Sequence, residues 1–149
     1  MKYRVLNTKE KKKVLELLEQ RFGFDDKLGY TFLQSAAKIY LANRELFDFD
    51  IESLRINNLG VYFCEIIGQD VRLSVEGSQL IGPKAKKNVV ELNSDEFNAW
   101  LKGMNINVDV DYDGFVIVKH GNDYAGCGRV KNNELKNYLP KTRRISKEA

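Results

Sequence analysis

Residues 114–130 have the sequence Gly-Phe-Val-Ile-Val-Lys-His-Gly-Asn-Asp-Tyr-Ala-Gly-Cys-Gly-Arg-Val, and this stretch decides the fold of the chain. β-Branched and aromatic residues fill the parts on either side of its centre, as is typical of strands. Gly121-Asn122-Asp123 lies between them and has the composition of a hairpin turn. The stretch therefore predicts two antiparallel strands, Phe115–His120 and Tyr124–Val130.

A third strand is expected to extend this hairpin. Residues 131–134, Lys-Asn-Asn-Glu, have turn composition and lead into the segment Leu135–Leu139. Pro140 ends that segment, because proline cannot donate a hydrogen bond to a neighbouring strand. We expect an antiparallel meander followed by a basic C-terminal segment, residues 141–147.

The residues before the meander predict a mixture of helices and strands. Asn7-Thr8-Lys9-Glu10 is a plausible capping box, apolar residues follow it at helical spacing, and Gly23 ends the helix. A second helix is predicted from Asn93 or Ser94 to Gly103, with Trp100 as a core anchor. The chain is predicted to have strands at 30–33, 38–41, 53–56, 60–67 and 71–75, and a turn or single helical turn at 77–83.

These elements predict an α+β chain with two domains. Gly68-Gln69-Asp70 has turn composition, and we place the boundary there. A small N-terminal α/β domain is expected over residues 1–69 and a second domain over residues 70–149.

The net charge of +3 is too small to indicate a partner, but its distribution is uneven. Residues 91–113 carry a net −5 and residues 119–147 a net +6, and three lysines lie within residues 84–87. Such runs can polarise a surface, although a charge run is often only a solvated face.

Several classes of protein are excluded or disfavoured. No apolar run approaches the ~20 residues that span a bilayer, and Met1-Lys2-Tyr3-Arg4 does not begin a secretion signal, so we expect no membrane partner. Cys64 and Cys127 stand alone, which favours a reducing cytoplasm. We therefore expect a cytoplasmic protein.

Motifs for metal or catalytic chemistry are incomplete. Asp109, Asp111, Asp113 and Gly114 match the start of an EF-hand calcium loop, but its twelfth position is His120 instead of a bidentate carboxylate. His120 is the only histidine, and no nucleophile or second metal ligand accompanies it. We expect no catalytic residue, no metal and no cofactor.

The second half of the chain resembles a PUA domain, the RNA-binding module named after pseudouridine synthases and archaeosine transglycosylases. The resemblance is carried by the segments Val71–Gly82, Lys87–Leu92, Gly114–Val130 and Asn137–Ile145. It is strongest to the PUA-like domain that follows the methyltransferase domain in the Nop/Sun family of RNA cytosine-5 methyltransferases. A small α/β domain before a PUA domain also resembles short ribosome-biogenesis factors of archaea and eukaryotes.

The resemblance implies a mixed β pseudo-barrel that docks on RNA through one face. The catalytic cysteine of the methyltransferases follows Pro or Thr, whereas Cys64 follows Phe63 and Cys127 follows Gly126. Methylation by these residues is therefore not expected, and both cysteines are interpreted as small buried residues.

The resemblance and the basic runs together predict an RNA-binding face. Arginine and lysine bind phosphates, and tyrosine can stack on unpaired bases, although Tyr124 and Tyr138 also suit half-buried strand packing. The predicted RNA-binding residues are Arg72, Lys84, Lys86, Lys87, Lys119, His120, Asn122, Tyr124, Arg129, Lys141, Arg143 and Arg144.

The sequence thus favours a non-catalytic protein that binds ribosomal or transfer RNA in ribosome biogenesis, rRNA processing or RNA modification. Acidic surfaces in the N-terminal domain and in residues 91–113 are expected to face protein partners or to resist wrong contacts. The alternative is a targeting subunit that supplies RNA specificity in trans to a separate RNA methyltransferase. An enzyme with an unrecognised carboxylate site is a more distant alternative.

Overall fold

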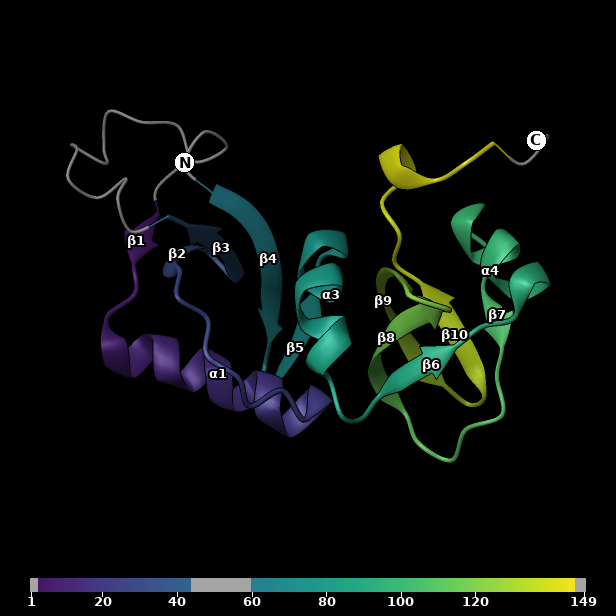
Figure 1. Cartoon of the computed structure of the whole chain (residues 1–149), viewed down its shortest axis with the longest axis horizontal. Helices are drawn as coiled ribbons and strands as arrows, with labels where there is room; N and C mark the ends of the chain where they lie inside the picture. Colours follow the sequence, from purple (N-terminus) through teal and green to yellow (C-terminus); the bar gives the residue numbers. More distant parts are fainter. Residues whose placement is uncertain (1–2, 44–59, 147–149) are drawn as a thin grey trace.

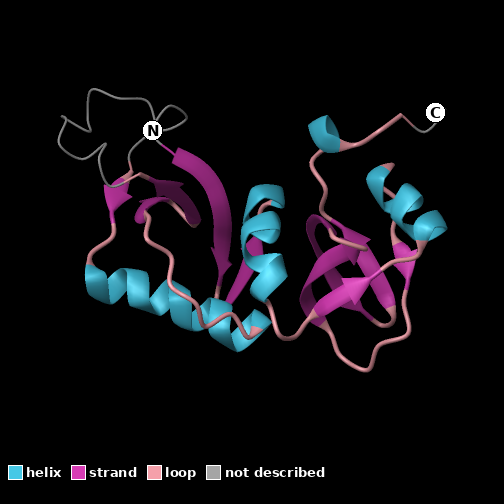
Figure 2. Ribbon diagram, viewed as in Figure 1, coloured by secondary structure: helices cyan, strands magenta, loops and turns pink. Residues whose placement is uncertain are grey.

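Two five-stranded sheets organise the chain in the computed structural model, which describes residues 3–43 and 60–146 (Figures 1 and 2). The strand order is β1-β2-β3-β4-β5 in the first sheet and β6-β8-β9-β10-β7 in the second. The second sheet curls into a half-barrel beside a small helix (Figure 1). The predicted α+β class with a PUA-type pseudo-barrel is confirmed.

The first sheet is antiparallel at every pairing. Its strands are β1 (Arg4–Val5), β2 (Thr31–Ser35), β3 (Lys38–Ala42), β4 (Gly60–Ile67) and β5 (Asp70–Leu73). The predicted strand at 53–56 and the acidic residues 45–52 lie outside the described residues.

Helix α1 (Thr8–Phe22) packs against this sheet and confirms the first predicted helix. The Asn7 side chain accepts a hydrogen bond from the Glu10 backbone N–H, and the Glu10 side chain accepts one from the Asn7 N–H, which completes the capping box. The helix ends at Gly23, whose φ of 65° lies in the left-handed region that glycine adopts most easily. The apolar face of α1 thereby lies on the core.

Helix α3 (Val75–Ile81) and the 3₁₀ turn η3 (Gly82–Lys84) lie between the two sheets (Figure 1). The predicted strand 71–75 was wrong in its last two residues, because the Ser74 side chain accepts a hydrogen bond from the Gly77 N–H at 2.9 Å and caps a helix. The segment predicted as a turn or single helical turn is therefore a two-turn helix that begins earlier.

The second sheet contains β6 (Val89–Glu91), β7 (Ile106–Asn107), β8 (Gly114–His120), β9 (Asp123–Lys131) and β10 (Glu134–Asn137). The antiparallel pairing of β8, β9 and β10 confirms the predicted meander, whereas the parallel pairing of β6 with β8 was not predicted. Helix α4 (Ser94–Leu101) closes this sheet with Trp100, which is 0% exposed and confirms the predicted anchor. The 3₁₀ turn η4 (Lys141–Arg143) follows β10.

The main hydrophobic core takes side chains from both sheets. Buried residues of α1 and the first sheet form one cluster with Phe115, Ile117 and Cys127 of the second sheet. The domain boundary predicted at residues 69/70 falls in the turn of the β4–β5 hairpin, whereas the change of sheet comes after η3. The division into domains 1–69 and 70–149 stays a prediction. In the described ranges, no helix has both the length and the apolar character to cross a membrane.

Replacing Leu18 by Ala tests whether this shared core makes the two sheets unfold together. Leu18 is 0% exposed in α1, so the change should lower the free energy of unfolding by about 2–5 kcal/mol. Trp100, the only tryptophan, reports on the second sheet. We expect its fluorescence midpoint in urea to fall together with the circular dichroism midpoint.

Glu16→Gln, on the exposed face of α1, is the control and should move neither midpoint. A Leu18→Ala protein whose Trp100 transition stayed at the wild-type urea concentration would show that the two sheets unfold independently.

Candidate nucleic-acid interface

Aromatic and cationic side chains alternate in a row that begins on the first sheet. Tyr40 of β3 and Tyr62 of β4 are cross-strand partners, with ring centres 5.6 Å apart. The Lys38 ammonium lies 5.2 Å from the centre of the Tyr62 ring, within the range of a cation–π contact. Both tyrosines are half-buried, so each ring keeps an accessible part.

Arg72 of β5 continues the row toward the second sheet. Its guanidinium lies 5.1 Å from the centre of the Tyr138 ring, just beyond β10. The same guanidinium pairs with Glu65, its cross-strand neighbour, at 2.8 Å. Burial and the Glu65 charge raise the pKa of Tyr62, and Arg72 opposes them, so the Tyr62 hydroxyl stays protonated at neutral pH.

Tyr138, Phe115 and Arg129 complete the row on the second sheet. The ring centres of Tyr138 and Phe115 are 6.3 Å apart, and the Arg129 guanidinium lies 5.4 Å from the centre of the Phe115 ring. Phe115 is buried, whereas Tyr138 is 39% exposed and Arg129 is exposed. The row is therefore anchored in the core and open to solvent at Tyr138.

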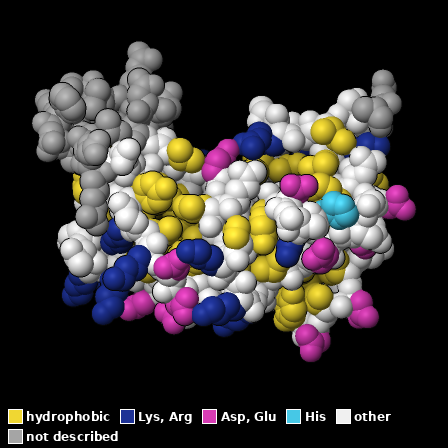
Figure 3. Space-filling view, viewed as in Figure 1, with side chains coloured by type: hydrophobic (Ala, Val, Ile, Leu, Met, Phe, Trp, Pro, Cys, Tyr) yellow, Lys and Arg dark blue, Asp and Glu magenta, His cyan; other side chains and the backbone are white. Residues whose placement is uncertain are grey.

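A small cleft of about 110 Å³ opens where the row passes from one sheet to the other. Tyr62, Arg72, Glu76, Tyr138 and Arg143 are among the residues that line it. In the space-filling view the upper edge of the molecule is hollowed above α3, where basic, acidic and hydrophobic side chains lie together (Figure 3). The cleft thus combines aromatic faces, cations and one carboxylate.

The carboxylate of the cleft belongs to Glu76, which pairs with Arg143 at 2.5 Å. Burial acts to raise the pKa of Glu76, but the hydrogen bonds from Arg143 and from its own backbone N–H outweigh burial and lower the pKa. Glu76 is therefore ionised at neutral pH and offers only hydrogen-bond acceptors.

The contacts between α3 and β4 fix the backbone at Glu76, and the ion pair with Arg143 orients its side chain. The Ser74 hydroxyl lies 2.7 Å from the Tyr62 carbonyl oxygen and 2.9 Å from that of Phe63. At Gly77 a Cβ atom would lie 2.2 Å from the Phe63 carbonyl oxygen, so only glycine allows this approach. These contacts therefore hold the start of α3 against β4, next to Tyr62 of the row of aromatic and cationic side chains.

Other predicted RNA-binding residues lie at the opposite end of α3. The Lys119 ammonium lies 5.6 Å from the centre of the Tyr124 ring. That ring packs on Gly82, where a Cβ would lie 2.2 Å from a ring carbon. Lys84 pairs with Asp26, and Lys86 pairs with Asp25 at 2.8 Å. This second group is thus partly neutralised by acids of the first half of the chain.

The remaining predicted residues do not join either group. His120 Nδ1 lies 2.8 Å from the Leu92 carbonyl oxygen, and its ring stacks on Phe97. Arg144 Nε donates to the Leu139 carbonyl at 2.9 Å. The other three predicted residues, Lys87, Asn122 and Lys141, are exposed.

The sequence analysis missed Lys38, Tyr40, Tyr62 and Glu76. The alternation in residues 60–67 places Tyr62 on one face of a strand, but its pairing with Tyr40 depends on a register shift in β3–β4. Glu76 was missed because the helical start at Val75 was predicted as strand. No single motif links these positions.

Nothing in residues 3–43 and 60–146 brings together three His, Cys, Asp or Glu side chains in a way that could hold a metal ion. Both cysteines are buried, as predicted. Burial raises the pKa of the Cys127 thiol to about 12 and that of Cys64 further still, so neither forms a thiolate at neutral pH.

The Gly77→Ala variant tests the close packing of α3 on β4. The added Cβ meets the Phe63 carbonyl oxygen, which belongs to the backbone and cannot rotate away, so we expect a loss of about 1–3 kcal/mol in the free energy of unfolding. Gly29→Ala is the matched control, because a Cβ there has no neighbour within 4 Å. Urea denaturation measures both. Equal stability of the two variants would contradict the close contact at Gly77.

Comparison with known proteins finds a family match within the second half of the chain. The family model described as "Methyltransferase RsmF PUA domain" matches residues 87–145, which contain the whole second sheet. The chain is also 21% identical over 140 residues to "Ribosomal RNA small subunit methyltransferase F" of Vibrio cholerae serotype O1, in strain M66-2 and in strain ATCC 39315 / El Tor Inaba N16961. In both cases the match covers 89% of this chain and 28% of the relative, so the chain spans less than a third of these relatives.

Proposed function

We propose that this chain, whose PUA domain resembles that of the Nop/Sun RNA methyltransferases, binds structured ribosomal or transfer RNA in RNA modification or ribosome biogenesis. The observation that carries the proposal is the row of aromatic and cationic side chains that passes the cleft between the sheets. Tyrosine rings stack on unpaired bases, and arginines bind phosphates bidentately.

The ion pairs within this face are compatible with RNA binding. Arg143 and Glu76 are 44% and 42% exposed, and such pairs contribute only about 0–1 kcal/mol. Arg143 therefore keeps accessible guanidinium N–H groups that a phosphate can contact while Glu76 stays beside it. Arg72 is held by Glu65 and Tyr138 in a fixed orientation, which reduces the conformational entropy lost on binding.

We propose further that the chain acts without catalysis. The support is chemical: both thiols are buried and protonated, and His120 is engaged with Leu92 and Phe97. The protein places RNA, and a separate enzyme modifies it. Two free thiols suit a reducing compartment, so we place this activity in the cytoplasm.

The salt dependence of RNA binding tests the proposal. The logarithm of the affinity for a structured RNA should fall linearly with the logarithm of salt concentration, with a slope of about −0.7 to −0.9 per phosphate contact. The double variant Arg72→Ala/Arg143→Ala should lose about two such contacts and make the slope shallower by about 1.4–1.8. Fluorescence anisotropy at several salt concentrations measures it.

Lys9→Ala/Lys131→Ala removes the same charge from exposed positions outside the cleft and is the matched control. It should leave the slope within the error of the wild type. If both double variants shifted the slope equally, binding would follow the total charge, and the cleft would not be the RNA-binding site.

The reactivity of the thiols tests the non-catalytic assignment. At pH 8.5 an ordinary cysteine is about half ionised, but burial keeps Cys64 and Cys127 protonated. We expect Ellman's reagent to label neither cysteine in the native protein and both in urea. Rapid labelling of one thiol in the folded protein would reveal a nucleophile and overturn the assignment.

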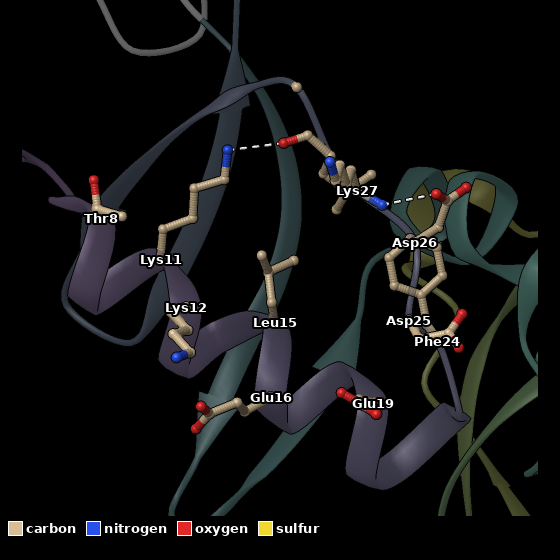
Figure 4. Close-up of a pocket in the computed structure, with 12 residues that line it drawn as sticks. Thr8, Lys11, Lys12, Leu15, Glu16, Glu19, Phe24, Asp25, Asp26 and Lys27 are labelled. Carbon is tan, nitrogen blue, oxygen red and sulfur yellow. Dashed lines mark hydrogen bonds between the residues drawn. The ribbon is translucent and has the colours of Figure 1, made fainter.

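A second candidate function is that of a targeting subunit for a separate RNA methyltransferase. A groove of about 670 Å³ between α1 and residues 24–29 favours it (Figure 4). Leu15, Phe24 and Leu28 supply its apolar lining, and lysines and acids surround them. Lys11 bridges the groove by donating to the Leu28 carbonyl at 2.8 Å.

Substitution within this groove separates the two candidates. Leu15→Glu should abolish co-purification of an RNA methyltransferase while leaving RNA affinity intact, if the chain acts in trans. Recovery of the same methyltransferase with the Leu15→Glu protein would eliminate the groove as its docking site.

A further inference from the structure

We infer that the cleft receives one unpaired base and that Glu76 selects a base with an exocyclic amino group over uracil. This inference rests on the proposed RNA-binding function and names the ligand of the same site. It follows from the size of the cleft, the chemistry of its rim and the rigidity of its carboxylate.

The size of the cleft limits the ligand to a single ring system. Its volume of about 110 Å³ lies well below the roughly 300–1,000 Å³ of pockets that enclose a drug-sized molecule. A base pair or a stacked dinucleotide does not fit. One base inserted edge-first does, while its ribose and phosphate stay outside.

The rim supplies a stacking surface and a phosphate contact. Tyr138 is 39% exposed, and its ring is held by Phe115 and Arg72, so it forms a rigid platform for a base. Arg72 lines the same cleft and keeps further guanidinium N–H groups beyond its bond to Glu65. A base stacked on Tyr138 therefore brings its phosphate near Arg72.

The pair of Glu76 and Arg143 presents an acceptor beside a donor. Cytosine, adenine and guanine each carry an amino group at the base edge, and glutamate accepts from such a group, as it does from cytosine N4 in DNA complexes. Arg143 then donates to an unprotonated ring nitrogen beside that amino group, such as N3 of cytosine or N1 of adenine. Uracil offers only N3–H, flanked by two carbonyl oxygens that the carboxylate repels.

The selection requires a carboxylate that stays in place. Glu76 is the second residue of α3, and α3 is held on β4 by the Ser74 hydroxyl and the close contact at Gly77. The lowered pKa of Glu76 keeps it ionised at neutral pH. The ionised carboxylate can then only accept hydrogen bonds, so the cleft prefers a base whose amino group donates one.

Two single-stranded probes of equal length and charge test the inference: a 12-nucleotide oligocytidine and a 12-nucleotide oligouridine. At fixed salt we expect the wild-type protein to bind oligocytidine about tenfold more tightly, the discrimination typical of one good base contact. Glu76→Gln keeps the side-chain shape but can both donate and accept, so it should bring the two affinities within about twofold. Glu16→Gln, on α1, is the matched control and should keep the tenfold preference.

The outcomes separate the two proposals. Equal wild-type affinities for the two probes, or a preference that survives Glu76→Gln, would overturn base selection and leave RNA binding in place. Absence of binding to either probe, with salt-dependent binding to a structured RNA retained, would overturn base selection alone, and absence of salt-dependent binding to the structured RNA as well would overturn both. Tyr138→Leu adds an independent readout, because loss of the stacking platform should weaken binding to both probes by a similar factor.

Discussion

The close contact between α3 and β4 determines how the two sheets meet. At Gly77 the backbone of the helix approaches the Phe63 carbonyl to a distance that excludes any side chain, and the Ser74 hydroxyl holds the preceding turn. The other faces of α3 contact β5 and β9, so one short helix touches both sheets. The cleft exists because the start of this helix lies beside the segment that follows β10. Without the contacts at Ser74 and Gly77, α3 would not place Glu76 within reach of Arg143.

Four of the ion pairs among the described residues join distant parts of the chain. The basic run at residues 84–87 faces Asp25 and Asp26, and Arg143 of the basic C-terminal segment faces Glu76. Arg21 of α1 pairs with Asp70 at the start of β5, at 2.6 Å. These pairs are partly exposed, so each contributes little to stability, and their cations remain accessible to RNA phosphates.

The sequence was sufficient for elements whose signals are local. The capping box at Asn7, the turn at Gly121-Asn122 and the helical spacing around Trp100 each depend on neighbours within a few residues, and each is confirmed. The resemblance to a PUA domain identified the second sheet. Charge clustering found Arg143, and Arg72 was predicted within the PUA-like segment Val71–Gly82; both line the cleft.

Long-range pairing could not be predicted from one sequence. Tyr62 meets Tyr40 only because the β3–β4 ladder shifts register, and Arg72 meets Tyr138 across two sheets. His120 was chosen for its chemistry, but in the structure its ring contacts Phe97 and Leu92. Strand alternation shows which face a side chain lies on, but it does not show what lies opposite.

The main hydrophobic core takes side chains from both sheets. This shared core has a consequence for how genes exchange the two halves of the chain. The similarity to the Vibrio cholerae enzymes extends over 140 residues and therefore through both sheets, although the PUA family model begins at residue 87. A recombination break between η3 and β6 would separate Phe115, Ile117 and Cys127 from the apolar residues that cover them. Genes that acquire this PUA domain are therefore expected to acquire the helix and sheet before it as well.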